Sequence, residues 1–305
     1  NLGNKYKILL KRFMEKVVKK LKLYSELLKL EHTIFALPFG LASLLILYKI
    51  FPSWGKILYI LGALVSARTL GMAFNRLIDK PFDEKNPRTS MWPHAQGLVK
   101  DWEIKLIILI SSFLFIFFCY KINFLALLLS PIVIFFLFIY PFAKRFTYFP
   151  HLFLGLVYFL IPIAIDIALN ENVSLIAIFL AGAMACWVSS FDILYSLQDI
   201  EFDKKVGLKS IPVKFGIKNA LRLAKFLHLI TFFLLLLTGY FYPKTTWIYF
   251  VGLILIAIFL TYEHSLLKEN DLSKINKAFF TVNGFISIIF FLVILINNLY
   301  YHFLK

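Results

Sequence analysis

The chain has 305 residues, of which 60% are hydrophobic and only 16% are charged, and its mean hydropathy is +0.80. Several apolar runs reach about eighteen residues or more, so these values exclude a soluble globular protein and indicate a polytopic helical membrane protein. The net charge of +16 is spread over the N-terminal segment and the connections between apolar runs. We attribute it to membrane orientation and attraction to anionic lipid rather than to nucleic acid, because no nucleic-acid-binding motif accompanies it.

Residues 1–30 are basic throughout and lack the uninterrupted apolar core of a signal peptide, so we expect no cleavable signal. Apolar or aromatic residues recur with a 3-4-4-3 spacing at Leu10, Phe13, Val17, Leu21 and Tyr24. This spacing places them on one face of a helix. The segment is therefore predicted to be a cationic amphipathic helix that lies on an anionic leaflet.

Nine apolar runs follow, each bounded by charged residues or by Pro and Gly. They lie near 32–50, 56–75, 104–120, 122–141, 149–168, 173–191, 219–241, 245–263 and 278–300. Each is long enough to cross a bilayer as a helix. The predicted fold is all-α: residues 31–305 form a single domain of nine transmembrane helices around a pocket that faces the cytoplasm.

Connections rich in Lys and Arg alternate with poor ones along the chain. The rich segments are the N-terminus, 76–105, 144–145, 204–218 and 268–277, whereas those near 49–56, 121, 170–174 and 244 carry few or none. The positive-inside rule then predicts an integral protein of the inner (cytoplasmic) membrane with a cytoplasmic N-terminus and, after nine spans, an external C-terminus. Two acidic motifs fall on the same cytoplasmic face.

The first motif is FNRLIDKPFDEKNPRT, in which Asn75, Asp79 and Asp83 are spaced four residues apart. This spacing lines one helical face, to which Arg68 also belongs. Pro81 lies between the two carboxylates and predicts that Asp83 comes from a new turn. Oxygen ligands on one face suit magnesium, which is usually shared with substrate phosphates. An ordinary charged loop is the alternative interpretation.

The second motif, FDILYSLQDIEFDKKVG, repeats the pattern. Asp192, Tyr195, Asp199 and Asp203 share a helical face, whereas Glu201 lies off it and is expected to be solvated. Three carboxylates on one face repel one another unless a cation lies between them. The motif therefore predicts a bound metal ion or a cationic partner such as Lys209.

Four segments carry a family resemblance: LEHTIFALPFG, ARTLGMAFNRLIDKPFDEKNPRT, YPFAKRFT and FDILYSLQDIEFDKKVGLKSIPVKFG. Together they resemble the UbiA-type intramembrane prenyltransferases, whose signatures are an NxxxDxxxD first motif and a DxxxD second motif. Within that superfamily the chain is most similar to the 4-hydroxybenzoate polyprenyltransferases and their relatives in menaquinone biosynthesis. The resemblance implies magnesium-dependent transfer of a polyprenyl chain from a polyprenyl diphosphate to an aromatic acid such as 4-hydroxybenzoate, in ubiquinone or menaquinone biosynthesis.

The resemblance also implies residue roles. It assigns Asn75, Asp79, Asp83, Asp199 and Asp203 to magnesium and the diphosphate. Arg145, in YPFAKRFT, matches an arginine that the family uses near the aromatic acid or the diphosphate. The chain departs from the family after NPRT, where it reads SMWPHAQG and Trp92 replaces an arginine. This departure places one phosphate contact of the usual loop in question and leaves the acidic ligands intact.

The implied chemistry gives further roles. An allylic diphosphate ionises to a carbocation when magnesium and cationic side chains take up the leaving-group charge, and the aromatic ring then attacks. We expect Lys144 to serve the phosphate and Arg145 to pair with the acceptor carboxylate through its planar fork. A carboxylate holds or deprotonates the phenol. The predicted catalytic residues are Asp192, Asp199, Arg145 and Tyr195, and the predicted substrate- and cofactor-binding residues are Asn75, Arg68, Lys144 and Lys209.

Two alternatives stay open on the sequence. The acceptor could instead be a menaquinone precursor or a glycerol-phosphate lipid. A secondary transporter would also have many spans, internal repeats and intramembrane acids. It predicts carboxylates near the bilayer midplane, however, whereas these carboxylates lie at the cytoplasmic ends of the runs. Magnesium dependence distinguishes prenyl transfer from transport.

Overall fold

The computed structural model of the protein describes residues 2–29 and 33–304. Residues 1 and 305 lie outside the described residues, as do residues 30–32, which open the LEHTIFALPFG motif and the first predicted span. The helices are α1 (Leu2–Leu28), α2 (Thr33–Leu47), α3 (Trp54–Asp83), α4 (Asp101–Ile122), α5 (Phe124–Ile139), η2 (Tyr140–Phe142), α6 (Ala143–Phe146), α7 (Pro150–Asn170), α8 (Leu175–Ser196), η3 (Leu197–Asp199), α9 (Ile200–Val206), α10 (Ile211–Phe241), α11 (Trp247–Ser265), the π-helix η4 (Lys277–Val282) and α12 (Asn283–Phe303).

Eight helical segments of the described chain are long and apolar enough to cross a membrane, judged by length and composition. They are Trp54–Asp83, Asp101–Ile122, Phe124–Phe146, Pro150–Asn170, Leu175–Val206, Ile211–Phe241, Trp247–Ser265 and Lys277–Phe303. α2 is a shorter ninth helix, apolar over Ala36–Leu47, and it packs against α7 and α12. The predicted all-helical membrane bundle is confirmed, and the protein is an integral membrane protein.

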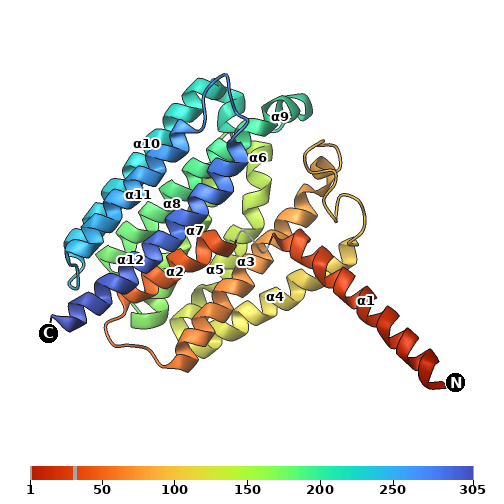
Figure 1. The fold of residues 1–305 in the computed structure, drawn as a ribbon, viewed down its shortest axis with the longest axis horizontal. Coiled ribbons are helices and arrows are strands. Elements are labelled where there is room, and N and C mark those ends of the chain that lie inside the picture. Colours follow the sequence, from red (N-terminus) through yellow and green to blue (C-terminus); the bar gives the residue numbers. More distant parts are fainter. Residues whose placement is uncertain (1, 30–32, 305) are drawn as a thin grey trace.

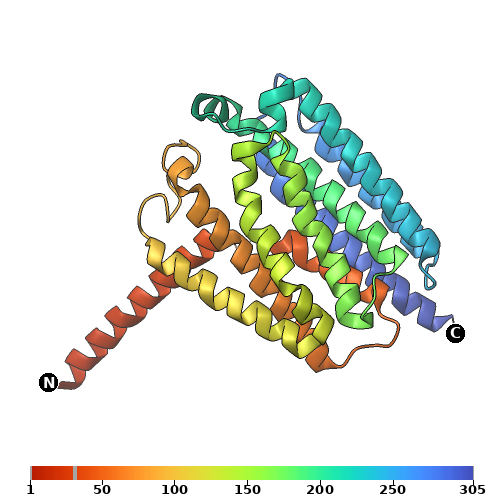
Figure 2. The same ribbon diagram turned by 180° about the vertical axis from the view of Figure 1, so that it is seen from behind.

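Helix α8 is the centre of the bundle, because it packs against α7 on one side and α10 on another. Its side chains Leu180, Met184, Trp187 and Leu194 are almost completely buried. Figures 1 and 2 show the long helices running side by side, with α9 and the 84–100 segment at one end of the bundle and the C-terminus at the other. Burial on several sides fixes the last turns of α8, which carry Asp192 and Tyr195. Asp199 lies in η3 and Asp203 in α9, so the prediction that all four residues share one helical face is wrong.

Local sequence explains where several helices begin. A side-chain oxygen of the residue before the helix accepts a hydrogen bond from a free backbone N–H of the first turn, which stabilises the helix start. These N-cap residues are Ser53 for α3, Asn123 for α5, Ser174 for α8, Ser210 for α10 and Thr246 for α11. Each lies directly before an apolar run, so the sequence itself sets these boundaries.

Helix α3 runs unbroken through Pro81 and ends at Asp83. The prediction that Asp83 comes from a new turn is therefore wrong. A proline removes only the bond that its own nitrogen would donate to the carbonyl four residues back, and here it lies in the last turn of a helix of 30 residues. Asn75, Asp79 and Asp83 consequently share one continuous helical face.

Asp166 has a structural role at the end of α7 opposite to the acidic motifs. It is 1% exposed and accepts hydrogen bonds from Asn170 Nδ2 at 2.6 Å and from the Ser174 backbone nitrogen at 2.7 Å. Asn170 also donates to the Leu47 carbonyl at 2.9 Å. These bonds tie the connections after α7 and after α2 together, so this buried carboxylate is satisfied by N–H donors.

The contact between α7 and α8 depends on Gly155. A Cβ added there would clash with Ser189 Oγ and would come within 2.8 Å of the Ala185 backbone oxygen, which cannot rotate away. We expect Gly155→Ala to destabilise the protein by about 1–3 kcal/mol through overpacking. Thermal unfolding in detergent measures this change. Gly55→Ala is the matched control, because nothing lies within 4 Å of a Cβ at that position, and an equal loss in both variants would contradict the packing argument.

Candidate active site

A cavity of about 780 Å³ opens at the end of the bundle that carries both acidic motifs and continues between α3, α4, α5 and α7. Its polar end is lined by all but one of the residues singled out in the sequence: Arg68, Asn75, Asp79, Asp83, Lys144, Asp192, Tyr195, Asp199, Asp203 and Lys209. Its far part is apolar and includes Ala63, Cys119, Ala126 and Ala168. The fold therefore brings two motifs that are more than 100 residues apart into one site.

Asp79 lies at the centre of the first motif and is 5% exposed. Its Oδ2 accepts hydrogen bonds from Asn75 Nδ2 at 2.8 Å and from Lys144 Nζ, also at 2.8 Å. Its Oδ1 is buried and has no hydrogen-bond partner within the described part of the chain. A buried carboxylate oxygen without a partner is unfavourable, so this atom has free capacity for a ligand.

Asp83 is held by the segment that follows α3. Its Oδ2 accepts a hydrogen bond of 2.8 Å from His94 Nε2, and its backbone oxygen accepts one of 3.0 Å from Thr89 Oγ1. His94 is completely buried. These two contacts fold the 84–100 segment back over the end of α3 and close one side of the cavity.

Asp199 of the second motif is bound by the same segment from across the cavity. Arg88 donates to both of its carboxylate oxygens, at 2.9 and 2.7 Å, and Asn86 Nδ2 donates at 3.0 Å. Burial lowers the pKa of Arg88, but the bonds to Asp199 and its negative charge outweigh burial and leave the pKa above its ordinary value. Arg88 also donates to the Tyr195 hydroxyl at 3.2 Å. A forked guanidinium thus joins the two motifs.

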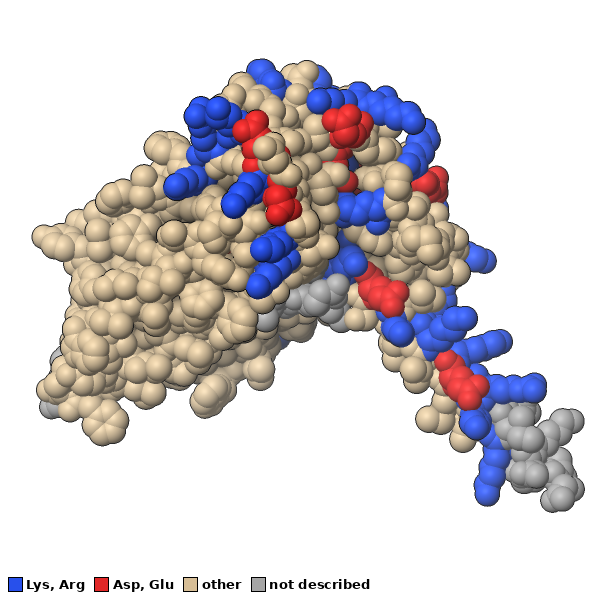
Figure 3. Space-filling model, turned by 45° about the horizontal axis from the view of Figure 1, so that its top comes forward, with Lys and Arg blue, Asp and Glu red and all other residues tan. Residues whose placement is uncertain are grey.

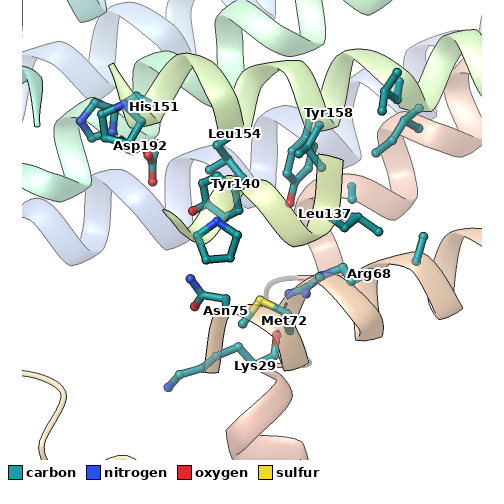
Figure 4. A pocket seen from close by; sticks show the side chains of 18 of the residues that line it. Lys29, Arg68, Met72, Asn75, Leu137, Tyr140, His151, Leu154, Tyr158 and Asp192 are labelled. Carbon is teal, nitrogen blue, oxygen red and sulfur yellow. Dashed lines mark hydrogen bonds and ion pairs between the residues drawn. The ribbon is translucent and has the colours of Figure 1, made fainter. Parts of the chain in front are cut away.

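Asp192 has a different partner. His151 Nδ1 lies 2.6 Å from Asp192 Oδ2 and donates to it, because an ionised carboxylate only accepts. His151 is buried, and its Nε2 lies 3.5 Å from Ser196 Oγ. Figure 4 shows the pair on the α7 and α8 side of the cavity, across from Asn75 and Arg68 of α3, with Tyr140 between the two sides. Asp192 is therefore oriented by a histidine that belongs to neither acidic motif.

Trp92 occupies the position at which the chain departs from the family pattern. Its ring lies 4.1 Å from the guanidinium carbon of Arg76, 5.5 Å from that of Arg88 and 5.2 Å from Lys29 Nζ. All of these residues line the cavity. An indole face attracts cations at such distances. Trp92 therefore gathers three cations around the polar end of the site.

Arg68 and Arg145 are the two arginines that could bind the acid group of an acceptor, and their side chains point to different places. Arg68 lines the cavity, and Figure 4 shows the Tyr158 hydroxyl pointing towards it. Arg145 is not among the cavity-lining residues of the described chain; it donates to the Ile78 carbonyl at 2.6 Å and stacks over Phe82 and Phe142. The acceptor role predicted for Arg145 thus has no geometric support.

Lys209 and Lys144 lie at the same rim. The Lys209 backbone nitrogen donates to the Lys144 carbonyl at 2.8 Å, and Lys209 Nζ lies 3.4 Å from the Phe146 carbonyl. Asp203 lines the cavity one turn beyond Asp199. Glu201 points to solvent, with its side chain 92% exposed, as the sequence predicted.

The donor set fits a hard divalent cation. Its ligands are carboxylate and amide oxygens, which such ions prefer, and Asp79 Oδ1 lacks a partner. Within the described residues, no three His, Cys, Asp or Glu side chains form a closed metal cluster. Ions of the magnesium type do not need one, because they keep several waters and share substrate phosphates.

The sequence interpretation missed several residues: Arg76, Asn86, Arg88, His94, Tyr140, His151 and Tyr158. Two of these residues could have been identified from the sequence. Arg88 stands in the quoted NPRT motif, and His151 is a polar residue at the start of an apolar span, a position that favours a functional role. Tyr195 is also held by Phe279 of the π-helix η4, with ring centroids 4.0 Å apart, and no local pattern predicts that contact.

A helical bundle whose cavity is charged at one end and apolar along its length defines an intramembrane enzyme for amphipathic anionic substrates. The chain matches the UbiA prenyltransferase family over residues 36–294. It belongs to this family and is a prenyltransferase.

Individual similar proteins support this family assignment. The chain is 32% identical over 285 residues to a 4-hydroxybenzoate octaprenyltransferase of Vibrio campbellii, covering 91% of this chain and 98% of the relative. The structure is similar to that of a UbiA homologue from Aeropyrum pernix K1, with a TM-score of 0.78 and 31% identity over 87% of this chain and 98% of that one. A UbiA homologue from Archaeoglobus fulgidus, solved with GPP and Mg²⁺, has the same fold, with a TM-score of 0.71 and 21% identity over 90% of this chain and 99% of that one.

Proposed function

We propose that the protein transfers a polyprenyl chain from a polyprenyl diphosphate to an aromatic acid, with 4-hydroxybenzoate as the first candidate, and that it requires magnesium. The observation that carries the proposal is the meeting of both acidic motifs and a cationic rim at the mouth of one apolar cavity. The octaprenyltransferase relatives support the reaction class and the acceptor. The homologue solved with GPP and Mg²⁺ supports the donor and the ion.

The diphosphate would occupy the polar end of the cavity. Asn75, Asp79, Asp83, Asp199 and Asp203 would hold magnesium, which neutralises the leaving diphosphate when it is bound. Lys144, Lys209, Arg76 and Arg88 supply the remaining positive charge around it. The prenyl tail would follow the apolar part of the cavity, where water that could quench a carbocation is excluded.

The acceptor would lie between the α3 side of the cavity and the His151–Asp192 pair. Arg68 takes the place of Arg145 in this proposal and pairs with the acid group, because Arg68 lines the cavity. The bond from the first prenyl carbon to the diphosphate oxygen breaks, and its electron pair leaves with the diphosphate. The ring carbon ortho to the hydroxyl bonds to that carbon. Asp192, oriented by His151, accepts the proton released from the acceptor.

We further propose that the site faces the cytoplasm of a bacterial-type inner membrane. Both motif loops carry many lysines and arginines, whereas the opposite connections carry few. The N-terminus would be cytoplasmic and the C-terminus external.

Isosteric variants test the metal and diphosphate site. We expect Asp79→Asn, Asp83→Asn, Asp199→Asn and Asp203→Asn each to lower turnover by at least about 10²-fold, because each removes one negative ligand. Chelation with EDTA should abolish product, and added Mg²⁺ should restore it. Product mass and diphosphate release are the measurements.

Glu201→Gln is the matched control for these variants, since its side chain is exposed, and it should stay close to the wild type. Near wild-type turnover in all four Asp variants would contradict the two-motif site.

A second comparison separates the two arginines. Arg68→Lys should raise the Michaelis constant for 4-hydroxybenzoate by roughly tenfold or more, because lysine cannot reproduce a forked pair with a carboxylate. Arg145→Lys should leave that constant within about twofold, since its guanidinium binds the Ile78 carbonyl. Steady-state kinetics with the acceptor varied gives both values. The opposite pattern would return the acceptor role to Arg145.

The orientation has a direct test. In a Cys119→Ala and Cys186→Ala background, a cysteine at Lys85 or Lys205 should react with a membrane-impermeant maleimide only from the cytoplasmic side. A cysteine at Asn172 should react only from outside. Inside-out and right-side-out vesicles provide the two exposures, and labelling of the two motif loops from opposite sides would refute a single shared site.

A further inference from the structure

Helix α1 carries an apolar strip that nothing in the described bundle covers. Its members are Leu10, Phe13, Met14, Val17, Val18 and Leu21, which are exposed by between 40% (Val17) and 64% (Phe13). At 100° per residue they occupy one continuous arc of the helix. Six large apolar side chains on one face of a projecting helix form a contact surface rather than scattered exposure.

The opposite arc of α1 is strongly cationic. The exposed residues Arg12, Lys16 and Lys19 lie there, and the exposed residues Lys11, Glu15 and Lys22 lie between them and one edge of the strip. Figure 3 shows Lys and Arg side chains along the whole described length of α1. An apolar arc flanked by lysines and arginines is the pattern of a helix that lies in a membrane interface.

The position of α1 agrees with this pattern. Figures 1 and 2 show it leaving the bundle beside α3 and α4 at a steep angle to the spanning helices, which is the direction expected of a helix that lies on a membrane surface. It is fixed there by Glu103 of α4, which binds Lys20 Nζ and the Tyr24 hydroxyl, both at 2.7 Å. Leu27 is fully buried against Ala73, Val99 and Ile104.

We propose that α1 docks on the anionic cytoplasmic leaflet and that this contact organises the active site. Anionic lipid is the occupant that fits both arcs, because acyl chains cover the apolar strip while the headgroups attract the lysines. The coupling to catalysis rests on the proposed function. The docking of α1 on the membrane does not depend on the proposed function.

The coupling follows from the C-terminal end of α1, where the Leu27 carbonyl of the last turn and the carbonyl of Lys29, which directly follows the helix, bind two arginines of the cavity. Arg76 Nε donates to the Leu27 carbonyl at 3.0 Å, and an Arg68 terminal nitrogen donates to the Lys29 carbonyl at 3.0 Å. The partial negative charge at a helix C-terminus strengthens such contacts. Lys29 in turn lies over Trp92, beside Arg76. The angle of α1 therefore sets the positions of the cationic groups that face the substrates.

A labelling experiment tests docking without relying on activity. In the Cys119→Ala and Cys186→Ala background, an environment-sensitive fluorophore is attached at Phe13→Cys or, on the opposite arc, at Lys16→Cys. The protein is reconstituted in vesicles of phosphatidylcholine alone or mixed with phosphatidylglycerol. The Phe13 label should shift to the blue and become accessible to a lipid-borne quencher in the mixed vesicles, and the Lys16 label should respond much less. Equal signals from both labels, or no dependence on phosphatidylglycerol, would overturn the docking.

An activity experiment tests the coupling. Phosphatidylglycerol should raise the prenyl-transfer rate of the wild type several-fold. The variant K11Q/K16Q/K19Q should lose that response and the Phe13 label shift together. The matched control K49Q/K56Q/K121Q removes two exposed lysines and one half-buried lysine at the other end of the bundle, and it should keep both the rate response and the label shift. A normal label shift together with the same prenyl-transfer rate in both vesicle types would overturn the coupling. Absence of prenyl transfer under all conditions would count against the proposed function and would not affect the label result.

Discussion

The site depends on the compensation of carboxylates in low-polarity surroundings. An ionised carboxylate removed from water is costly unless a cation or several hydrogen-bond donors accompany it. Asp79 has Lys144, Asp83 has His94, Asp199 has Arg88, and Asp192 has His151. Each partner comes from a different part of the chain from its acid. The pairing requirement therefore ties together the end of α3, α6, the start of α7, the end of α8 with η3, and the 84–100 segment.

The same requirement fits the proposal that this rim would accept magnesium and a diphosphate. Asp79 keeps one buried oxygen without a partner, and Asp203 faces the cavity beside Asp199. A cation that entered here would replace the lysine and arginine partners of the carboxylates. Those lysines and arginines would then be free to bind the phosphates. The charges are thus already assembled before substrate binds, which avoids the reorganisation that water would need.

The cavity also separates two kinds of chemistry along one axis. Most of the charged residues line one end of the cavity, whereas small and apolar side chains such as Ala63, Ala126 and Ala168 line the far part. A lipid tail and its diphosphate can therefore bind in one continuous space. The His151–Asp192 pair lies on the α7 and α8 side of the cavity, across from Asn75 and Arg68 of α3.

The sequence by itself determined the membrane class, most of the spans, the amphipathic first helix and the first acidic face, because hydropathy and a four-residue spacing are local properties of one helix. The sequence did not predict that the second motif is divided among α8, η3 and α9. It failed at Pro81, where the position within a long helix outweighed the residue type. Only the tertiary structure decided which groups meet across helices: it directed Arg145 towards the Ile78 carbonyl, gave Asp199 to Arg88, and placed His151 against Asp192. Such partners depend on the packing of distant segments, which no local spacing encodes.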